Sequence, residues 1–351
     1  MAPTTTQSFH PQSPHARTLP SPDGSGEMSY RPLGNSGLMV SEIGLGCNNF
    51  GRPGSATEGQ AGTDAVIGAA IDAGITLFDT ADMYGSTFGG SEKLMGQSLG
   101  ARRNDIVLAS KFGYYGVDTP IREWGSRANR GYIRRAVEGS LTRLRTDWID
   151  LYQLHAPDPI TPIGETIVAL DELVREGKIR YIGHSNLSGW QIAEAHYVAQ
   201  ELGSTAFISA QNEFSLVRRH NDAEVLPAAA RFGLGMLPFF PLANGLLTGK
   251  FHRDDFPADS RIMRQRPHVA ENANWDALDA YRAHCEVWGI TMLQATFGWM
   301  LAHEPIASVI AGATTPEQVR QNAQAATGWR PTAEQYRIID ELFPAPEVLP
   351  V

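Results

Sequence analysis

The chain has little cysteine, no long apolar run and no excess of positive charge. Only two of its 351 residues are cysteines, and Cys47 and Cys285 lie far apart without C-x-x-C spacing. This pattern argues against a disulfide framework or a thiolate metal site and suits a reducing cytoplasm. The ten histidines show no H-E-x-x-H spacing, so we expect no metal site. The absence of an apolar run near 20 residues and a formal net charge of −9 argue against membrane and nucleic-acid partners.

Residues 1–28 differ in composition from the rest of the chain. They are rich in Pro, Ser and Thr and lack hydrophobic periodicity. Such a segment buries too little apolar surface to offset the entropy lost on ordering. We therefore expect a disordered tail over residues 1–28 and a single folded domain over residues 29–351.

Short apolar runs alternate with amphipathic stretches through the folded part. Helices are predicted where apolar positions recur every three or four residues, as in "GYIRRAVEGSLTRLR" and "IGETIVALDELVREGK". The eight expected strands lie in "IGLGCNNF", "ITLFDTA", "DIVLASKFG", "IDLYQLH", "IRYIGHSN", "AFISAQNEF", "LGMLPFFPL" and "ASVIAGAT". Alternation of strands and helices implies parallel pairing, and eight such units predict a (β/α)8 TIM barrel of the α/β class.

The segment "RPLGNSGLMVSEIG" predicts an N-terminal β-hairpin before the barrel. Its turn is expected at Asn35, Ser36 and Gly37, because Asn and Gly tolerate the positive φ of tight turns. An open doubly wound sheet is the alternative architecture. It is disfavoured because the first expected strand is not followed by a Gly-rich dinucleotide-binding turn.

Polar residues end most of the expected strands. In a barrel the carboxyl ends of the strands meet at one rim, which is where barrel enzymes form their active sites. The strand-end residues are Asn48, Asn49, Asp79, Lys111, His155, Ser185, Asn186, Gln211 and Asn212. We expect them to share one pocket.

Tyr84, Lys111, Asp79 and His155 together suit proton donation to an oxygen. A tyrosine with a pKa of about 10 is a weak acid at neutral pH. An adjacent ammonium from Lys111 would lower that pKa, and Asp79 would keep Lys111 charged and oriented. A neutral His155 would donate a hydrogen bond to a carbonyl oxygen. These four residues are the expected catalytic group, with Tyr84 as the general acid.

From about Tyr30 to Ala326 the chain resembles the aldo-keto reductase superfamily. The segments "LFDTADMYG", "LASKFG" and "DWIDLYQLHAPD" are similar to those that carry the family's Asp, Tyr, Lys and His. The resemblance implies a bacterial-type, NAD(P)H-dependent barrel enzyme of the carbonyl reductase type. Such an enzyme reduces an aldehyde or ketone to an alcohol by hydride transfer.

The resemblance also implies a cofactor site. Ser185 and Asn186 of "GHSNLS", with Gln211, would hold the nicotinamide carboxamide, and Phe240 would stack on its ring where many relatives have Tyr. The alternative for Phe239 and Phe240 is that both belong to the core. The residues expected around the pyrophosphate and adenosine phosphate are Leu242, Asn244, Gly245, Lys250, Arg261, Gly312, Thr314, Gln318 and Asn322.

Cofactor preference is less well defined by the sequence. Some branches of the family place Lys and Arg near the positions of Gly312 and Gln318, where they pair with the 2′-phosphate of NADP, and neither charge is present here. Because other branches with Gly and Gln still use NADP, we predict NADPH, with NADH as the alternative. Arg320 or a loop arginine would then replace the missing charges.

The substrate is expected to be a small carbonyl compound or the corresponding alcohol. Residues in the loops after the strands suggest an aromatic, moderately polar pocket, and the oligomeric state stays open. The pocket candidates are Asn49, Phe50, Tyr114, Tyr115, Trp124 and Phe214.

Two other functions are compatible with the same barrel. One is an NADPH-binding regulatory or sensor subunit with slow turnover. The other is a lyase in which Lys111 forms a Schiff base, although a lysine held protonated by Asp79 suits that chemistry poorly.

Overall fold

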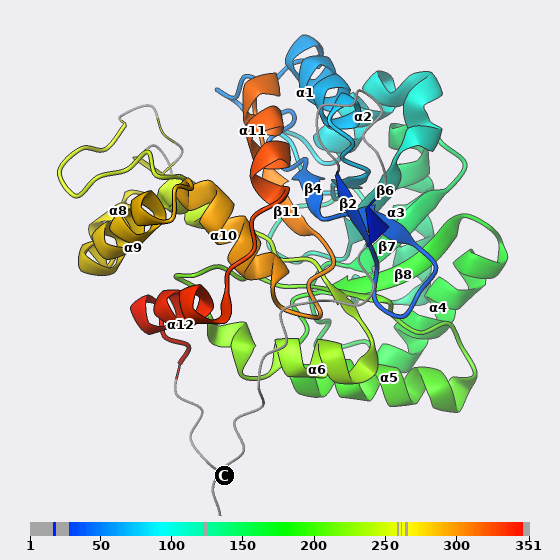
Figure 1. Cartoon of the computed structure of the whole chain (residues 1–351). Coiled ribbons are helices and arrows are strands. Elements are labelled where there is room, and N and C mark those ends of the chain that lie inside the picture. The colour runs from blue at the N-terminus through cyan, green and yellow to red at the C-terminus, as the bar shows by residue number, and fades with distance from the viewer. Residues whose placement is uncertain are drawn as a thin grey trace, which may run out of the picture.

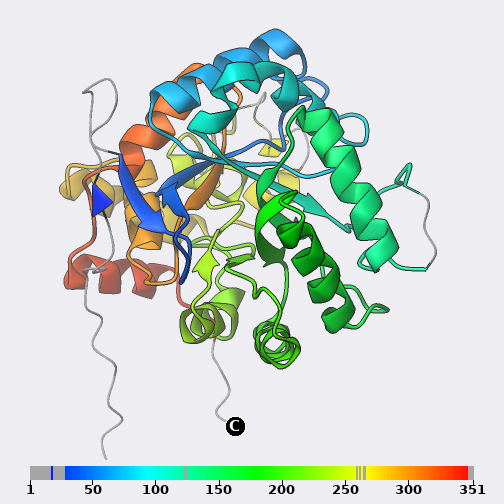
Figure 2. The same ribbon diagram turned by 90° about the vertical axis from the view of Figure 1, so that its right-hand side faces the viewer.

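Eight parallel strands form the centre of the molecule, and helices surround them (Figures 1 and 2). The computed structural model describes residues 17–18, 28–121, 125–257, 260, 262–263 and 266–346. The barrel strands are β4 (Ile43–Gly46), β5 (Leu77–Asp79), β6 (Val107–Phe112), β7 (Ile149–Leu154), β8 (Ile179–Ser185), β9 (Ser209–Gln211), β10 (Gly235–Met236) and β11 (Val309–Gly312). Each lies in a segment predicted to hold a strand.

The strands pair in the order β10-β9-β8-β7-β6-β5-β4-β11. The remaining gap is closed by backbone hydrogen bonds that flank the β10 and β11 strands. Met236 N donates to Pro305 O at 2.6 Å, and Ile310 N donates to Pro238 O at 3.0 Å. The ring of strands is therefore closed, and the predicted (β/α)8 barrel is confirmed.

Helices follow most of the strands and bury one face against them. Those around the barrel are α1 (Gln60–Asp72), α2 (Gly90–Leu99), α3 (Arg130–Leu144), α4 (Ile163–Arg175), α5 (Gly189–Leu202), α6 (Val225–Phe232), α10 (Met292–Leu301) and α11 (Pro316–Ala326). Further helical segments are α8 (Pro267–Glu271), α9 (Trp275–Val287), α12 (Ala333–Leu342), η1 (Gly100–Asp105), η2 (His220–Asp222) and η3 (Ala243–Thr248). α11 packs beside α1, which closes the outer ring of helices (Figure 1).

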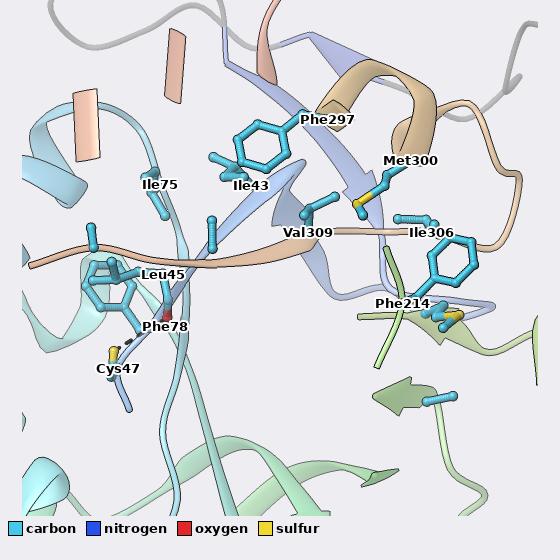
Figure 3. Packing of buried hydrophobic residues seen from close by; sticks show 14 of the residues in the cluster. Ile43, Leu45, Cys47, Ile75, Phe78, Phe214, Phe297, Met300, Ile306 and Val309 are labelled. Atoms are coloured by element: carbon cyan, nitrogen blue, oxygen red, sulfur yellow. Dashed lines mark hydrogen bonds between the residues drawn. The ribbon is translucent and has the colours of Figure 1, made fainter. Parts of the chain in front are cut away.

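The main core lies between the strands and the helices. Ile43 of β4 and Val309 of β11 belong to one buried cluster with Phe297 of α10 (Figure 3). These side chains leave the strands on the face opposite to the barrel interior, as the period-two alternation of a strand requires. Their burial fixes which strand residues face inward.

The predicted hairpin is present and covers the amino ends of the barrel strands. β2 (Ser29–Pro32) pairs antiparallel with β3 (Met39–Ser41). Gly34 adopts the positive φ of +58° that the sequence analysis assigned to Asn35 and Gly37. Asn35 N also donates to Gly233 O at 2.8 Å, which attaches the turn to the barrel. The hairpin is confirmed, but the residue that supplies the unusual backbone conformation is Gly34.

Part of the segment predicted to be disordered has a place in the fold. The backbone of β1 (Arg17–Thr18) pairs with β2, and the Met28 side chain is 2% exposed. The other residues of the 1–28 segment lie outside the described part of the chain.

Within the described residues, we find no helix with the length and apolar character needed to traverse a bilayer.

Candidate active site

A cavity of about 1220 Å³ opens at the carboxyl ends of the barrel strands. Residues at or just after the carboxyl ends of β4, β5, β6, β7, β8, β9, β10 and β11 line it, so it lies at the rim predicted for the active site. Pockets for drug-sized ligands have volumes of about 300–1,000 Å³. The cavity is therefore large enough for an extended cofactor together with a small substrate.

Lys111 and Asp79 form a buried ion pair below the cavity. The two residues lie on the neighbouring strands β6 and β5, and Lys111 is 0% exposed. Lys111 Nζ donates to Asp79 Oδ2 at 2.6 Å and to Thr80 O at 2.9 Å. Burial alone would lower the pKa of Lys111, but Asp79 and Tyr84 outweigh it and hold the pKa above its ordinary value. Lys111 is thus an ammonium at neutral pH.

Asp79 is held by two glutamines as well as by Lys111. Gln211 Nε2 donates to Asp79 Oδ1 at 3.0 Å, and Gln153 Nε2 donates to the same oxygen at 3.3 Å. Gln211 was predicted to bind the nicotinamide, whereas no role was predicted for Gln153. Gln211 also lines the cavity, so its position is compatible with both contacts.

Tyr84 lies on the turn after β5, directly above this pair. Asp82 N donates to Lys111 O at 3.0 Å, which fixes the turn against β6. The Tyr84 ring centroid is 5.0 Å from Lys111 Nζ and 5.8 Å from the His155 ring centroid. Burial raises the pKa of Tyr84 more than Lys111 lowers it, so the pKa lies above its ordinary value. Lys111 acts in the predicted direction, but the phenol is protonated at neutral pH.

His155 follows β7 and is 7% exposed. Burial, reinforced by the charge of Lys111, lowers the pKa of His155 well below its ordinary value. The imidazole is therefore neutral at physiological pH, as predicted. Tyr114 lies against it with ring centroids 4.9 Å apart, and His155 Nδ1 is buried without a hydrogen-bond partner among the described residues.

Ser185 and Asn186 form a small polar cluster at the end of β8. Ser185 Oγ donates to Gln211 O at 2.8 Å, and Asn186 Nδ2 donates to His155 O and to Ser185 Oγ, each at 3.0 Å. Asn186 has a φ of +62°, a left-handed conformation that asparagine adopts more readily than most residues. Both side chains line the cavity.

The loop after β10 supplies another wall. Phe239 and Phe240 both line the cavity with their ring centroids 5.3 Å apart, so the alternative that both are core residues is wrong. Phe240, Ala243 and Asn244 have positive φ values, which fix a tightly curved backbone. Other predicted cofactor residues that line this wall are Leu242, Asn244, Gly245 and Lys250.

The end of β11 and the start of α11 complete the cavity. Gly312, Thr314, Gln318 and Asn322 all line it. The Thr315 side chain accepts a hydrogen bond from Gln318 N, and Pro316 at the first helical position has no amide hydrogen. Fewer free amide groups therefore face an anion at this helix start than at an uncapped helix without proline.

Several predicted residues lie elsewhere. Phe50 is 0% exposed in the core, and Phe214 stacks on Trp299 with ring centroids 5.4 Å apart. Tyr115 is 39% exposed and donates its hydroxyl hydrogen to Asp158. These three do not line the cavity, whereas Asn49 and Tyr114 do. Trp124 and Arg261 lie outside the described residues.

Two cationic cavity residues were missed by the sequence analysis. Arg52 follows the end of β4, and Arg266 lies before α8. The Arg266 guanidinium carbon is 5.1 Å from the centroid of the Phe240 ring. The position of Arg52 only six residues after β4 was a usable signal, but nothing in the sequence distinguishes Arg266 from a surface arginine.

Comparison with known proteins identifies the family. A profile of the Aldo/keto reductase family matches residues 42–343. The chain belongs to this family. It is therefore a member of an oxidoreductase family that uses nicotinamide cofactors and acts on small-molecule substrates.

Three relatives illustrate the range of the similarity. The chain is 34% identical to the uncharacterized oxidoreductase YrpG of Bacillus subtilis (strain 168), over 91% of this chain and 97% of the relative. It is 34% identical to a probable voltage-gated potassium channel subunit beta of Oryza sativa subsp. japonica, over 85% of this chain and 91% of the relative. It is 32% identical to L-glyceraldehyde 3-phosphate reductase of Escherichia coli O157:H7, over 92% of this chain and 94% of the relative.

Proposed function

We propose that this aldo-keto reductase reduces an aldehyde or ketone to an alcohol, with Tyr84 as the general acid. The observation that carries the proposal is the position of a protonated Tyr84 above the buried Lys111–Asp79 pair and beside a neutral His155. All of these groups meet at one rim of the barrel. The cavity there also contains the amide and aromatic groups expected to hold a nicotinamide.

The residues around the cavity suit NAD(P)H. Asn244 Oδ1 is buried without a hydrogen-bond partner among the described residues, which leaves an acceptor available to a bound group. Ser185, Asn186 and Gln211 would orient the carboxamide, and Phe240 would stack on the ring. Lys250 would bind the pyrophosphate. When bound, the cofactor supplies the hydride that adds to the carbonyl carbon.

Tyr84 would donate its phenolic proton to the carbonyl oxygen as negative charge develops there. Its raised pKa keeps that proton in place before the reaction. Lys111, 5.0 Å from the ring centroid, would stabilise the phenolate that forms, and Asp79 with its two glutamine partners would keep Lys111 charged. His155 would donate a hydrogen bond that positions the carbonyl oxygen.

The test is the consumption of NADPH or NADH with a panel of aldehydes and ketones, for the wild type and Tyr84→Phe. We expect Tyr84→Phe to lower kcat by about 10²–10⁴-fold, the usual contribution of a general acid, while cofactor affinity stays nearly unchanged. Tyr197→Phe is the matched control because Tyr197 is exposed on α5, away from the cavity. Near-normal kcat in Tyr84→Phe would show that Tyr84 is not the acid.

We propose NADPH as the preferred cofactor. Lys250 and Arg266 line the cavity and supply positive charge, although Gly312 and Gln318 do not. The same assay, run with each cofactor at matched concentration, measures the preference. A kcat/KM that favours NADH by about tenfold, equivalent to about 1.4 kcal/mol, would reverse it.

A regulatory role is the second candidate, because some relatives are named as potassium channel β subunits. Tight NADPH binding without turnover on any tested carbonyl would favour it. The lyase alternative is disfavoured because the raised pKa of Lys111 leaves little free amine for Schiff-base formation. Borohydride trapping of a carbonyl ligand on Lys111 would support the lyase instead.

A further inference from the structure

One cation in the cavity, Arg52, has no role in the proposed chemistry. Among the described residues that line it, the cations are Arg52, Lys250 and Arg266, and the only acidic residue is Asp79. The charge of Asp79 is balanced by Lys111. Three positive charges therefore face this cavity in a chain whose formal net charge is −9.

Arg52 lies on a different segment of the chain from the other two cations, although Arg266 lies within its electrostatic reach. Lys250 and Arg266 belong to the long segment after β10, where the Arg266 guanidinium lies against the Phe240 ring on the expected cofactor side. Arg52 lies in the connection between β4 and α1. Its neighbour Gly51 accepts a hydrogen bond through its carbonyl oxygen from Ser86 N at 2.9 Å, which ties this connection to the turn that carries Tyr84.

The loop that carries Arg52 is internally bonded. Arg52 N donates to Asn49 O at 3.2 Å, Gly51 N donates to Thr57 O at 2.9 Å, and Thr57 Oγ1 donates to Asn49 O at 3.0 Å. The Asn49 side chain lines the same cavity. A half-buried arginine on such a framework loses less conformational freedom on binding than one on a free surface loop.

The pKa of Arg52 reflects a partly buried position near other cavity residues. Burial lowers the pKa of Arg52 from its ordinary value, Tyr84 opposes this shift, and Arg266 adds to it. The Arg52 guanidinium therefore lies within electrostatic reach of both Tyr84 and Arg266. It nevertheless keeps its charge, because an arginine stays protonated at any physiological pH.

We propose that Arg52 binds an anionic group on the carbonyl substrate, so that the enzyme prefers aldehydes or ketones that carry a carboxylate or a phosphate. This inference rests on the proposed reductase function, because the carbonyl is assumed to lie at Tyr84. The planar guanidinium matches either anion with two parallel hydrogen bonds. Its partly buried position strengthens the attraction relative to an exposed pair.

The test compares anionic carbonyl compounds with neutral analogues of similar size. Succinic semialdehyde is compared with its methyl ester, para-carboxybenzaldehyde with its methyl ester, and glycolaldehyde phosphate with glycolaldehyde. For each pair, the ratio of kcat/KM for the anionic to the neutral compound is measured in wild type, Arg52→Gln and Arg52→Lys. Arg231→Gln, which removes an exposed charge on α6 outside the cavity, is the matched control.

We expect wild type and Arg231→Gln to favour the anionic member of at least one pair, and Arg52→Gln to lower that ratio by about tenfold or more. Arg52→Lys should restore part of the ratio, since it keeps a point charge without the bidentate geometry. A preference confined to the carboxylate pairs or to the phosphate pair identifies which anion binds. Higher salt should weaken the wild-type preference.

Three results would overturn the inference while leaving the reductase function intact. One is efficient reduction with no anionic preference in wild type, and another is a preference that Arg52→Gln leaves unchanged. The third is a large rise in the KM for NADPH in Arg52→Gln with an unchanged ratio, which would place Arg52 on the cofactor. If no carbonyl compound is reduced at all, the proposed function fails instead.

Discussion

Asp79→Asn should destabilise the protein because it leaves the ammonium of Lys111 buried without an opposing charge. Asparagine keeps the size of the side chain but not its charge. Lys111 is 0% exposed, and besides Asp79 it donates to the uncharged Thr80 carbonyl oxygen at 2.9 Å. Removing one partner of a buried pair costs about 3–5 kcal/mol, and we expect a loss of that size near neutral pH.

A double-mutant cycle separates this effect from simple loss of packing. In Lys111→Met, the Asp79 carboxylate keeps the amide hydrogen bonds from Gln153 and Gln211, so the cost should be smaller. The double variant contains neither charge and should be more stable than Asp79→Asn alone. We expect a coupling free energy of about 2 kcal/mol or more between the two positions.

The pH dependence provides an independent measurement. Burial lowers the pKa of Lys111 and Asp79 is the largest influence that raises it, so in Asp79→Asn the pKa falls below the unfolded value of 10.5. The folded variant then binds fewer protons than the unfolded chain, and its stability rises with pH. The gain appears at pH values below 10.5 and is at most about 1.4 kcal/mol per pH unit for this one proton. The wild type should show no such gain from Lys111, because its raised pKa keeps the residue protonated across this range.

Urea unfolding of the four proteins at about pH 7 and about pH 9, followed by circular dichroism, tests the reasoning. A cost below about 1 kcal/mol for Asp79→Asn, typical of an exposed pair, would refute it. Additive effects in the cycle would also refute it, because they would show that the charge of Lys111 does not depend on Asp79.

Two further predictions concern the stability of the fold. His184 is fully buried, neither ring nitrogen has a partner among the described residues, and burial lowers its pKa to about 3. Below about pH 6.5 the unfolded chain binds a proton at His184 that the folded protein does not, which removes about 2 kcal/mol of stability between pH 7 and pH 5. In urea titrations across this range, His184→Leu should lose less stability than the wild type. Gly34→Ala should lower stability by about 2 kcal/mol or more, because its Cβ would lie 2.4 Å from Gly233 O at a φ of +58°. Gly177→Ala, with a φ of +75° and no atom within 4 Å, should cost only the backbone strain of about 1–2 kcal/mol, and equal losses in both variants would show that the close approach at Gly34 is unimportant.

The sequence predicted the barrel well because its signals are periodic. Eight apolar runs and the intervening amphipathic stretches define the strands and helices, and parallel pairing follows from their alternation. The hairpin was also predicted, but its unusual backbone residue was not. Both Gly34 and Asn35 suit a turn, and the tertiary contact that leaves no room for a Cβ at Gly34, 2.4 Å from Gly233 O, cannot be read from the sequence.

Side-chain direction limited the prediction of the cavity. Asn49 faces the cavity while Phe50 packs in the core, and Tyr114 faces it while Tyr115 does not. In each case two adjacent loop residues point in different directions, which sequence alone does not specify. Gln153, in contrast, could have been predicted from the sequence. It lies on β7 two residues before His155, and strand alternation places both side chains on the same face.

The raised pKa of Tyr84 changes how Lys111 is understood. If Lys111 lowered the resting pKa below the ambient pH, the phenol would lose its proton before a carbonyl arrived. Burial prevents this, so the charge of Lys111 has its main effect when the proton leaves and negative charge appears on the phenolate oxygen. An interaction that is stronger in the transition state than in the ground state raises kcat, whereas one that is equally strong in both lowers only KM. Lys111→Met should therefore reduce kcat far more than it changes substrate affinity, and the buried carboxylate of Asp79 contributes to catalysis by maintaining that charge.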